Sequence, residues 1–340
     1  LWANRYCLLD TSSGASMAVR EMLLQLARRG FEIGVVGATI FDSERGRSLL
    51  GPQLEKTRNE PGDVVQVRDG PLLHSLVRTA SPKAPEMTFA ECGKLFTLYC
   101  KTLEEFEPDL VWFYGGNSFD YLFPSEAKRR GIRTAAYLGN GNYKSKLWSR
   151  DVDTILTDSR ATADLYARRL DLDVTPVGTF IRPERYIAPE HRREYVTFVN
   201  PVMSKGAGLV VQLALALEEK RPDIRFEIVE SRGKWAETLS RVSKVLGTPR
   251  DALRNVRVTG HTDDMRPVYA RSRLVLMPSL GWESAGRVLA EAALNGIPGI
   301  VTNRGGPPEM IGEGGVPGSL PHTMHQPPYT RMCGQAGVDA

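Results

Sequence analysis

The amino-terminal part of the chain alternates short apolar runs with segments of helical period. The pattern predicts a strand over 5–9, a helix over 15–26 and a second strand over 31–37. The buried face of that helix is expected to consist of residues three or four positions apart: Ala15, Ala18, Val19, Met22, Leu23 and Leu26. A strand, a small polar loop and a helix are the opening of a Rossmann-like unit.

The same alternation continues to residue 177. Between 41 and 85 the pattern is poor, and charged and Gly/Pro-containing stretches predict long loops around one or two strands near 64–67. Beyond that region, helices are expected over 87–106, up to Arg130 and over 161–169, and strands over 109–113, 133–138, 155–157 and 174–177. Strands that alternate with helices predict a parallel sheet with helices on both faces.

A second set of strands and helices follows a charged, proline-containing stretch, 180–195, that is typical of an interdomain linker. Strands are expected over 196–199, 225–229 and 274–277, and helices over 207–220 and after Glu283. The sequence therefore predicts an α/β protein of two Rossmann-like domains facing across a cleft, with domains at 1–180 and 181–320 and an irregular tail at 321–340.

The last helix carries the most informative pattern. Its apolar positions follow the spacing of a helix buried on one face: Ala285, Val288, Leu289, Ala292 and Ala293. Two acids, Glu283 and Glu291, fall outside this stripe. If the intervening residues are helical, the acids are separated by about 12 Å along the axis. That is about the length over which a nucleotide sugar exposes its hexose and then its ribose. The alternative for both acids is a solvated helix face.

Polar loops follow several predicted strands, at the edge where open α/β sheets bind ligands. Gly14 lies in the first of these loops, and Asn117 and Asn140 follow later strands of the first domain. Lys205 precedes the helix at 207–220, where its charge opposes the helix dipole unless an anion is bound there. Gly14 could equally serve only the turn.

Composition narrows the class of protein modestly. Hydrophobic residues make up 41% and charged residues 25% of the 340 residues, as in soluble globular proteins. The net charge of +4 is small and says little about partners. Basic doublets lie at the ends of predicted helices, where they complement the helix dipole, so we expect no nucleic-acid partner. No apolar run is long enough to span a membrane. The four cysteines lack metal-ligand spacing and follow no secretory signal, so we expect a cytoplasmic protein with reduced thiols.

The motif Glu283-Ser284-Ala285-Gly286, followed by Glu291-Ala292 and Gly296-Ile297-Pro298, resembles that of the retaining glycosyltransferases of family 4, which have the GT-B fold. Further motifs agree with this family, and the ordered set covers 258–309: Val258-Thr259-Gly260, Tyr269-Ala270, Pro278-Ser279 and Gly305-Gly306-Pro307-Pro308-Glu309. The resemblance implies sugar transfer from a nucleotide-sugar co-substrate with retention of configuration, and neither a metal nor another cofactor.

The resemblance also implies roles for individual residues. Glu283 would contact the transferred sugar, Glu291 would bind the ribose, and Lys205 would lie against the diphosphate. The helix entrance would face the same diphosphate, with Gly14 beside it; its residues are Ser284, Ala285, Gly286 and Arg287. Two further loops would border the base, and they contain Glu230, Arg232, Gly260 and His261. His261 also fits an ordinary loop histidine. Asn117 and Asn140 are the candidates on the acceptor side.

Three features depart from the family pattern. None of the five histidines lies in the loops after 109–113 or 133–138, where many family members carry one beside the reacting sugar. The arginine that usually accompanies the lysine is absent near Val199 and Asn200, so the diphosphate clamp is incomplete unless Arg182, Arg232 or Arg287 substitutes. Residues 319–340 have no apolar period where the family has further helices.

These departures leave other functions open. A sugar phosphorylase or an epimerase of the same architecture would depend on free phosphate or need no acceptor. A catalytically weak nucleotide-sugar-binding protein would fail to hydrolyse the donor. The donor sugar, the base and the acceptor, whether carbohydrate, lipid-linked, protein or small molecule, are not specified by the sequence.

Overall fold

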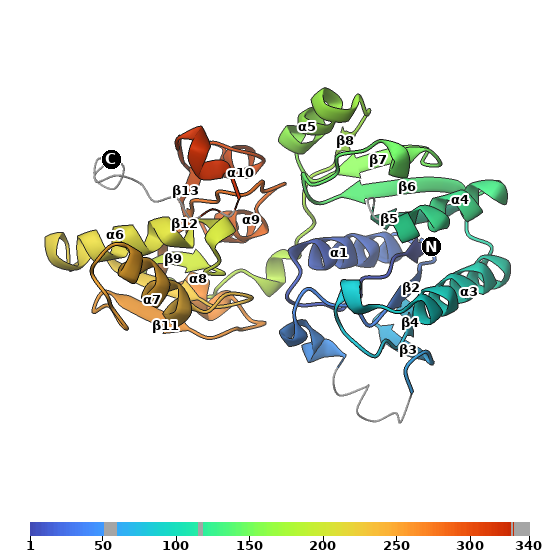
Figure 1. The fold of residues 1–340 in the computed structure, drawn as a ribbon, viewed down its shortest axis with the longest axis horizontal. Coiled ribbons are helices and arrows are strands. Elements are labelled where there is room, and N and C mark those ends of the chain that lie inside the picture. The colour runs from blue at the N-terminus through green and yellow to red at the C-terminus, as the bar shows by residue number, and fades with distance from the viewer. Residues whose placement is uncertain (51–59, 115–117, 328, 330–340) are drawn as a thin grey trace. The chain divides into compact units, whose positions relative to one another are not determined.

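The computed structural model describes residues 1–50, 60–114, 118–327 and 329. The chain divides into two compact units, Leu1–Ile181 and Arg182–Ala340 (Figure 1). Each unit is an α/β structure with a predominantly or wholly parallel sheet. The predicted fold class, two Rossmann-like units, is therefore confirmed.

The amino-terminal unit has an eight-stranded sheet in the order β3-β4-β2-β1-β5-β6-β7-β8. Its strands are β1 (Trp2–Ala3), β2 (Gly34–Ala38), β3 (Val64–Asp69), β4 (Leu72–Val77), β5 (Leu110–Tyr114), β6 (Arg133–Leu138), β7 (Thr154–Thr157) and β8 (Thr175–Pro176). Only the edge strand β3 is antiparallel to its neighbour. Because β2 and β5 flank β1, the strand order reverses at the boundary of β1 and β5.

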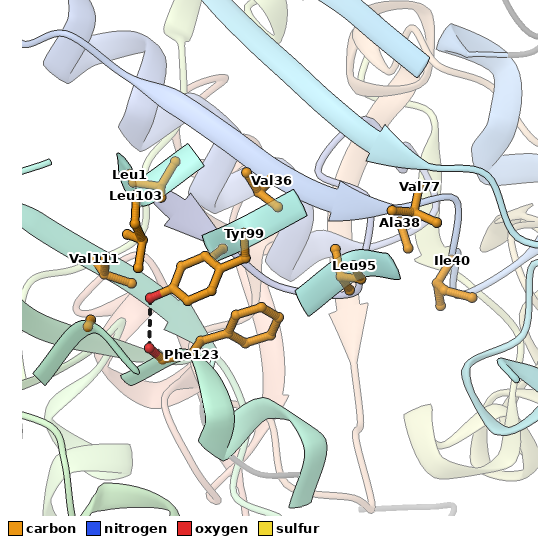
Figure 2. Packing of buried hydrophobic residues seen from close by; sticks show 12 residues of the cluster. Leu1, Val36, Ala38, Ile40, Val77, Leu95, Tyr99, Leu103, Val111 and Phe123 are labelled. Carbon is orange, nitrogen blue, oxygen red and sulfur yellow. Dashed lines mark hydrogen bonds between the residues drawn. The ribbon is translucent and has the colours of Figure 1, made fainter. Parts of the chain in front are cut away.

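Helices pack apolar residues against this sheet. They are α1 (Gly14–Arg28), α3 (Phe89–Phe106), α4 (Leu122–Arg129) and α5 (Arg160–Leu170), with short 3-10 helices η1 (Glu44–Leu49), η2 (Ala84–Glu86), η3 (Ser118–Tyr121) and η4 (Leu147–Ser149). Residues of α3 and α4 share a core with β1, β2, β4 and β5 (Figure 2). Residues of α1 form a separate core with Trp2 and Val35. These two residues directly precede Ala3 and Val36, which belong to the first core. Successive strand residues point to opposite faces, so these cores lie on the two faces of the sheet.

The carboxyl-terminal unit has a wholly parallel sheet of six strands in the order β11-β10-β9-β12-β13-β14. Its strands are β9 (Tyr195–Val199), β10 (Arg225–Val229), β11 (Val256–Thr259), β12 (Ser272–Met277), β13 (Gly299–Thr302) and β14 (Gly315–Gly318). Its helices are α6 (Ala207–Lys220), α7 (Trp235–Val245), α8 (Arg266–Arg271), α9 (Arg287–Ala293) and α10 (Pro307–Ile311), and its 3-10 helices are η5 (Pro183–Arg185), η6 (Met203–Lys205) and η7 (His322–His325). Helices α6 and α7 share one core with β9, β10 and Leu276.

Most predicted elements are confirmed, but there are exceptions. The strand expected over 5–9 is wrong: the strand is Trp2–Ala3, and Tyr6 forms only an isolated bridge to Ile40. Helix α7 was not predicted, although Trp235, Leu239 and Val242 have helical spacing and are buried in its core.

A second correction concerns the helix after Glu283. It begins only at Arg287, because Gly286 adopts a left-handed conformation with φ +87°. Of the predicted apolar stripe, Ala285, Leu289 and Ala292 are buried, whereas Val288 is half-buried and Ala293 is exposed. The separation expected for a continuous helix from Glu283 to Glu291 therefore does not apply.

The buried hydroxyl of Tyr99 gives a test of the amino-terminal core. Tyr99 is fully buried in α3, and its hydroxyl donates to the Phe123 carbonyl at 2.7 Å (Figure 2). Tyr99→Phe should lower the free energy of unfolding by about 1 to 3 kcal/mol, because it leaves a buried carbonyl without that donor. Urea denaturation measures the change. Phe89→Leu, at an exposed position of the same helix, should leave stability nearly unchanged, and equal stability of both variants with the parent would contradict this interpretation.

Candidate functional site

Two predicted catalytic residues meet where the strand order of the carboxyl-terminal sheet reverses. From β9 the chain proceeds to β10 on one side, and β12 lies on the other. Lys205 follows β9 and Glu283 follows β12, so both lie beyond the carboxyl ends of neighbouring parallel strands. This is the position at which open α/β sheets bind ligands.

Lys205 and Glu283 form a direct ion pair although 78 positions separate them in the chain. The Lys205 ammonium donates to Oε1 of Glu283, and the Ser279 hydroxyl donates to the same oxygen at 3.3 Å. The side chains are 24% and 15% exposed, so each retains some access to solvent. A ligand with both negative charge and hydroxyl groups can be met by the ammonium and the carboxylate together.

The backbone allows the two loops to approach closely. Gly206 has φ +83°, and a Cβ at this position would overlap the carbonyl oxygen of Pro278. The Ser204 carbonyl accepts from the amides of Leu280 and Gly281 at 2.9 and 2.8 Å. Glycine is therefore required in the Lys205-Gly206 pair for packing against the loop after β12.

A third loop, after β13, packs against the backbone of Glu283. The amide of Gly306 donates to the Glu283 carbonyl at 3.0 Å. A Cβ at Gly305 would overlap that carbonyl oxygen, and one at Gly306 would overlap the carbonyl oxygen of Ser284. The glycines of the Gly-Gly-Pro-Pro motif thus fix the path of the backbone at 283–284.

Glu291 is buried and paired, which excludes the solvated helix face as its environment. It is 4% exposed; one carboxylate oxygen accepts from the Tyr269 hydroxyl at 2.6 Å, and the other lies 2.8 Å from Nε of Arg287. Burial raises the pKa of the Glu291 carboxyl despite the Arg287 charge and these hydrogen bonds. A role in ribose binding stays a prediction, and a ribose would have to share or replace these partners.

Arg287, the first residue of α9, is largely buried and paired within the unit. Its side chain is 12% exposed, its guanidinium lies 5.2 Å from the ring centroid of Tyr186, and it donates to the Tyr186 hydroxyl at 2.8 Å. Of the proposed substitutes for the missing arginine, Arg287 is thus committed to Glu291 and Tyr186. Arg232 is exposed in the loop after β10, and Arg182 is the first residue of the carboxyl-terminal unit.

The segment before β9 is held by Asn295, which follows α9. Asn295 is buried; its Oδ1 accepts from the Ala188 amide at 2.8 Å, and its Nδ2 donates to the carbonyls of Tyr186 and Glu291. Arg193 donates to the Asn295 carbonyl at 2.7 Å. The sequence analysis did not single out Asn295 or Tyr186, because their partners lie more than 100 positions away.

The residues expected to border the base lie beyond β10 and β11. Glu230 is buried, accepts from the Trp235 amide at 3.0 Å and pairs with Lys234, so it stabilises the start of α7. Gly260 is exposed, with open space at its Cβ position. His261 is half-buried, 3.4 Å from Asp263.

In the amino-terminal unit, Gly14 and Asn140 follow β1 and β6 at the carboxyl edge of the sheet. Gly14 is the first residue of α1, is exposed, and has no atom within 4 Å of its Cβ position. It lacks a positive φ, so the turn does not require glycine. Asn140 accepts from the Asn142 amide through its side chain and from the Tyr166 hydroxyl through its carbonyl. Asn117 lies outside the described residues.

This fold and site agree with comparisons to known proteins. Residues 193–323 match the family model described as glycosyl transferases group 1. The matched residues include Lys205, Glu283 and Glu291, and the match confirms the predicted resemblance to glycosyl transferases of group 1. Membership of family 4 and retention of configuration stay predictions. No curated protein matches the sequence significantly.

Solved structures extend the likeness to both units. A glycosyltransferase from Rickettsia africae ESF-5 matches with a TM-score of 0.63 at 13% identity, covering 92% of this chain and 81% of its own. The trehalose-6-phosphate synthase OtsA matches with a TM-score of 0.62 at 12% identity, covering 91% and 85%. Anabaena Alr3699/HepE, in complex with UDP and glucose, gives 0.55 at 16% identity, covering 72% of each chain.

This chain spans 53% of the matched chain in the GtfA/B complex, where the TM-score is 0.53 at 12% identity. At such identities the structures establish the shared GT-B type of fold. With the family match, they support a glycosyltransferase. None of the described helices combines the length and apolar character needed to cross a bilayer.

The buried Arg287–Glu291 pair generates a stability prediction. Arg287→Met should destabilise the protein by about 3 to 5 kcal/mol, because it leaves Glu291 buried without its cation. A carboxyl whose folded-state pKa is raised loses stability as pH rises through that pKa. The loss should therefore be greater at pH 8 than at pH 5 in chemical denaturation.

The double variant Arg287→Met/Glu291→Gln supplies the control, since it removes the titrating group. Its stability should lack the additional fall between pH 5 and pH 8 that the single variant shows. The same pH dependence in both variants would assign the effect to another group.

Proposed function

We propose that this protein transfers a glycosyl group from a nucleotide sugar to an acceptor, with retention of configuration and without a metal ion. The observation that carries the proposal is the Lys205–Glu283 pair at the reversal point of the carboxyl-terminal sheet, inside the region that matches the family model. A nucleotide sugar presents a diphosphate and sugar hydroxyls within a few ångströms of each other, and the pair offers one complementary group for each.

The roles of the two residues follow from their chemistry. The Lys205 ammonium would neutralise charge that develops on the leaving diphosphate. The Glu283 carboxylate would accept hydrogen bonds from the transferred sugar and hold its anomeric carbon in position. The leaving phosphate can itself take the acceptor's proton, so the proposal does not require a histidine in the amino-terminal unit.

The resting ion pair must open when the donor binds. Glu283 then exchanges the Lys205 ammonium for sugar hydroxyls, while Lys205 turns to the diphosphate. Both side chains are partly exposed, which keeps the cost of this exchange lower than for a fully buried pair. Ser279 can remain on Glu283 throughout.

The proposed nucleotide is a uridine diphosphate. HepE is described in complexes with UDP, with UDP-glucose, and with UDP and glucose. These compounds are therefore the first donors to test. A cytoplasmic location stays a prediction from the sequence, which specifies no acceptor class.

Glu283→Gln separates transfer from donor binding. The variant should lose more than tenfold in turnover, since a charged hydrogen bond contributes about 1.5 to 3 kcal/mol. Its affinity for a nucleoside diphosphate should be kept or increased, because Lys205 is no longer neutralised. Product formation and calorimetry measure the two effects. Turnover near that of the parent would remove Glu283 from the reaction.

Lys205→Ala tests the contact with the diphosphate. The variant should bind UDP at least tenfold more weakly and uridine almost as the parent does, because only UDP carries the charge that Lys205 meets. Titration of both ligands into both proteins provides the comparison. Equal losses for UDP and uridine, or no loss for either, would return Lys205 to a purely structural role.

A further inference from the structure

A segment near the carboxyl end lies on the loop that carries Glu283. After β14 the chain forms η7, in which Met324 is buried. Nδ1 of His325 lies 3.0 Å from the carbonyl oxygen of Leu280. Tyr329 Oη is 3.6 Å from the Cβ position at Gly281. The amides of Leu280 and Gly281 donate to the carbonyl of Ser204, which precedes Lys205. Leu280 therefore contacts both His325 and the loop that carries Lys205.

A second basic residue approaches the same loop from β13. Arg304 follows β13 and precedes Gly305, which packs on the carbonyl of Glu283. Arg304 is half-buried. Burial lowers the pKa of the His325 imidazole; the Leu280 carbonyl opposes this, and the nearby charges of Arg304 and His322 lower it further. Arg304 and His325 thus belong to two segments that contact the loop after β12, through Gly305 on the Glu283 carbonyl and through His325 on the Leu280 carbonyl.

Acids of the described residues form no ion pair with these basic side chains. Within the described residues, no ion pair joins Arg304, His322 or His325 to a carboxylate, and Glu283 is paired with Lys205. A partly buried guanidinium without a counter-charge carries a desolvation cost, which a bound anion would offset. His325 contacts the loop after β12, at the reversal point of the sheet.

We infer that Arg304 and His325 provide the second cationic contact for the donor's diphosphate, beside Lys205. This inference rests on the proposed function and fills the position left by the arginine that is absent near Val199 and Asn200. The Arg304 guanidinium can fork onto two phosphate oxygens. His325 becomes protonated when the anion binds, because a neighbouring negative charge favours the imidazolium.

The inference gives donor binding a definite dependence on pH. The groups that face His325 are Arg304, His322 and the Leu280 carbonyl. Without ligand, its lowered pKa leaves the imidazole largely neutral at pH 7. A bound diphosphate raises that pKa, so binding takes up a proton and should tighten as pH falls from 8 to 6. UDP-glucose is the suitable probe, because the terminal phosphate of UDP itself titrates near pH 6.

Calorimetry on the full chain tests each residue. Arg304→Gln should weaken UDP-glucose about tenfold or more at pH 7 and leave uridine unchanged. His325→Gln should bind UDP-glucose as the parent does at pH 8 but lose the tightening toward pH 6. Arg273→Gln is the matched control, since it removes one positive charge at an exposed position at the amino-terminal end of β12.

Equal losses in Arg304→Gln and Arg273→Gln, or an unchanged pH dependence in His325→Gln, would overturn the inference. Pyrophosphate separates it from the proposed function. If UDP-glucose fails to bind the parent but pyrophosphate binds and depends on Arg304, the anion site stands and the nucleotide assignment fails. If neither binds the parent, the anion site is also refuted.

Discussion

The close contact between the loops after β9 and β12 is the constraint on which the candidate site depends. Gly206 lies against the Pro278 carbonyl where no side chain fits, and two amides of the second loop donate to Ser204. This backbone contact, rather than the ion pair itself, brings Lys205 and Glu283 together. Partly exposed ion pairs contribute little to stability. A side chain at position 206, by contrast, would overlap the Pro278 carbonyl oxygen, so the two loops would have to move apart. The charged groups are therefore held by a backbone that does not rely on their attraction.

Much of the fold could be predicted from sequence because the signals were local. Helix α6 and strands β6 and β10 have the predicted bounds, since apolar period and glycine or proline ends determine them. The early strand at Trp2–Ala3 was misplaced because an apolar run at 5–9 looks like a strand whether or not a neighbour pairs with it. Pairing with β2 and β5 decides the strand, and neither partner is visible in a local window.

The sequence identified the charged residues of the candidate site but not the partners of Glu291. Lys205 and Glu283 were identified from a motif, and the structure places them in contact. Glu291 was also identified, but its environment was not. Tyr269, which donates to Glu291, lies 22 positions away in the chain. Tyr186, which contacts Arg287, lies more than 100 positions from that arginine. A helical wheel assigns every acid outside the apolar stripe to solvent. The structure instead buries this acid beside a cation four residues earlier, and the Tyr269 hydroxyl donates to its second oxygen. The Tyr186 hydroxyl accepts from the same cation, Arg287.

Asn295 shows that the unit starts earlier than its family match. The match begins at residue 193, yet the buried amide of Asn295 makes its hydrogen bonds to Ala188 and Tyr186, which precede it. A fragment cut at residue 193 would leave both ends of that amide short of a partner, at about 1 to 3 kcal/mol for each unsatisfied group. It would also expose the face of Arg287 that Tyr186 covers. The segment that matches the family model is therefore shorter than the segment that contains the hydrogen-bond partners of Asn295.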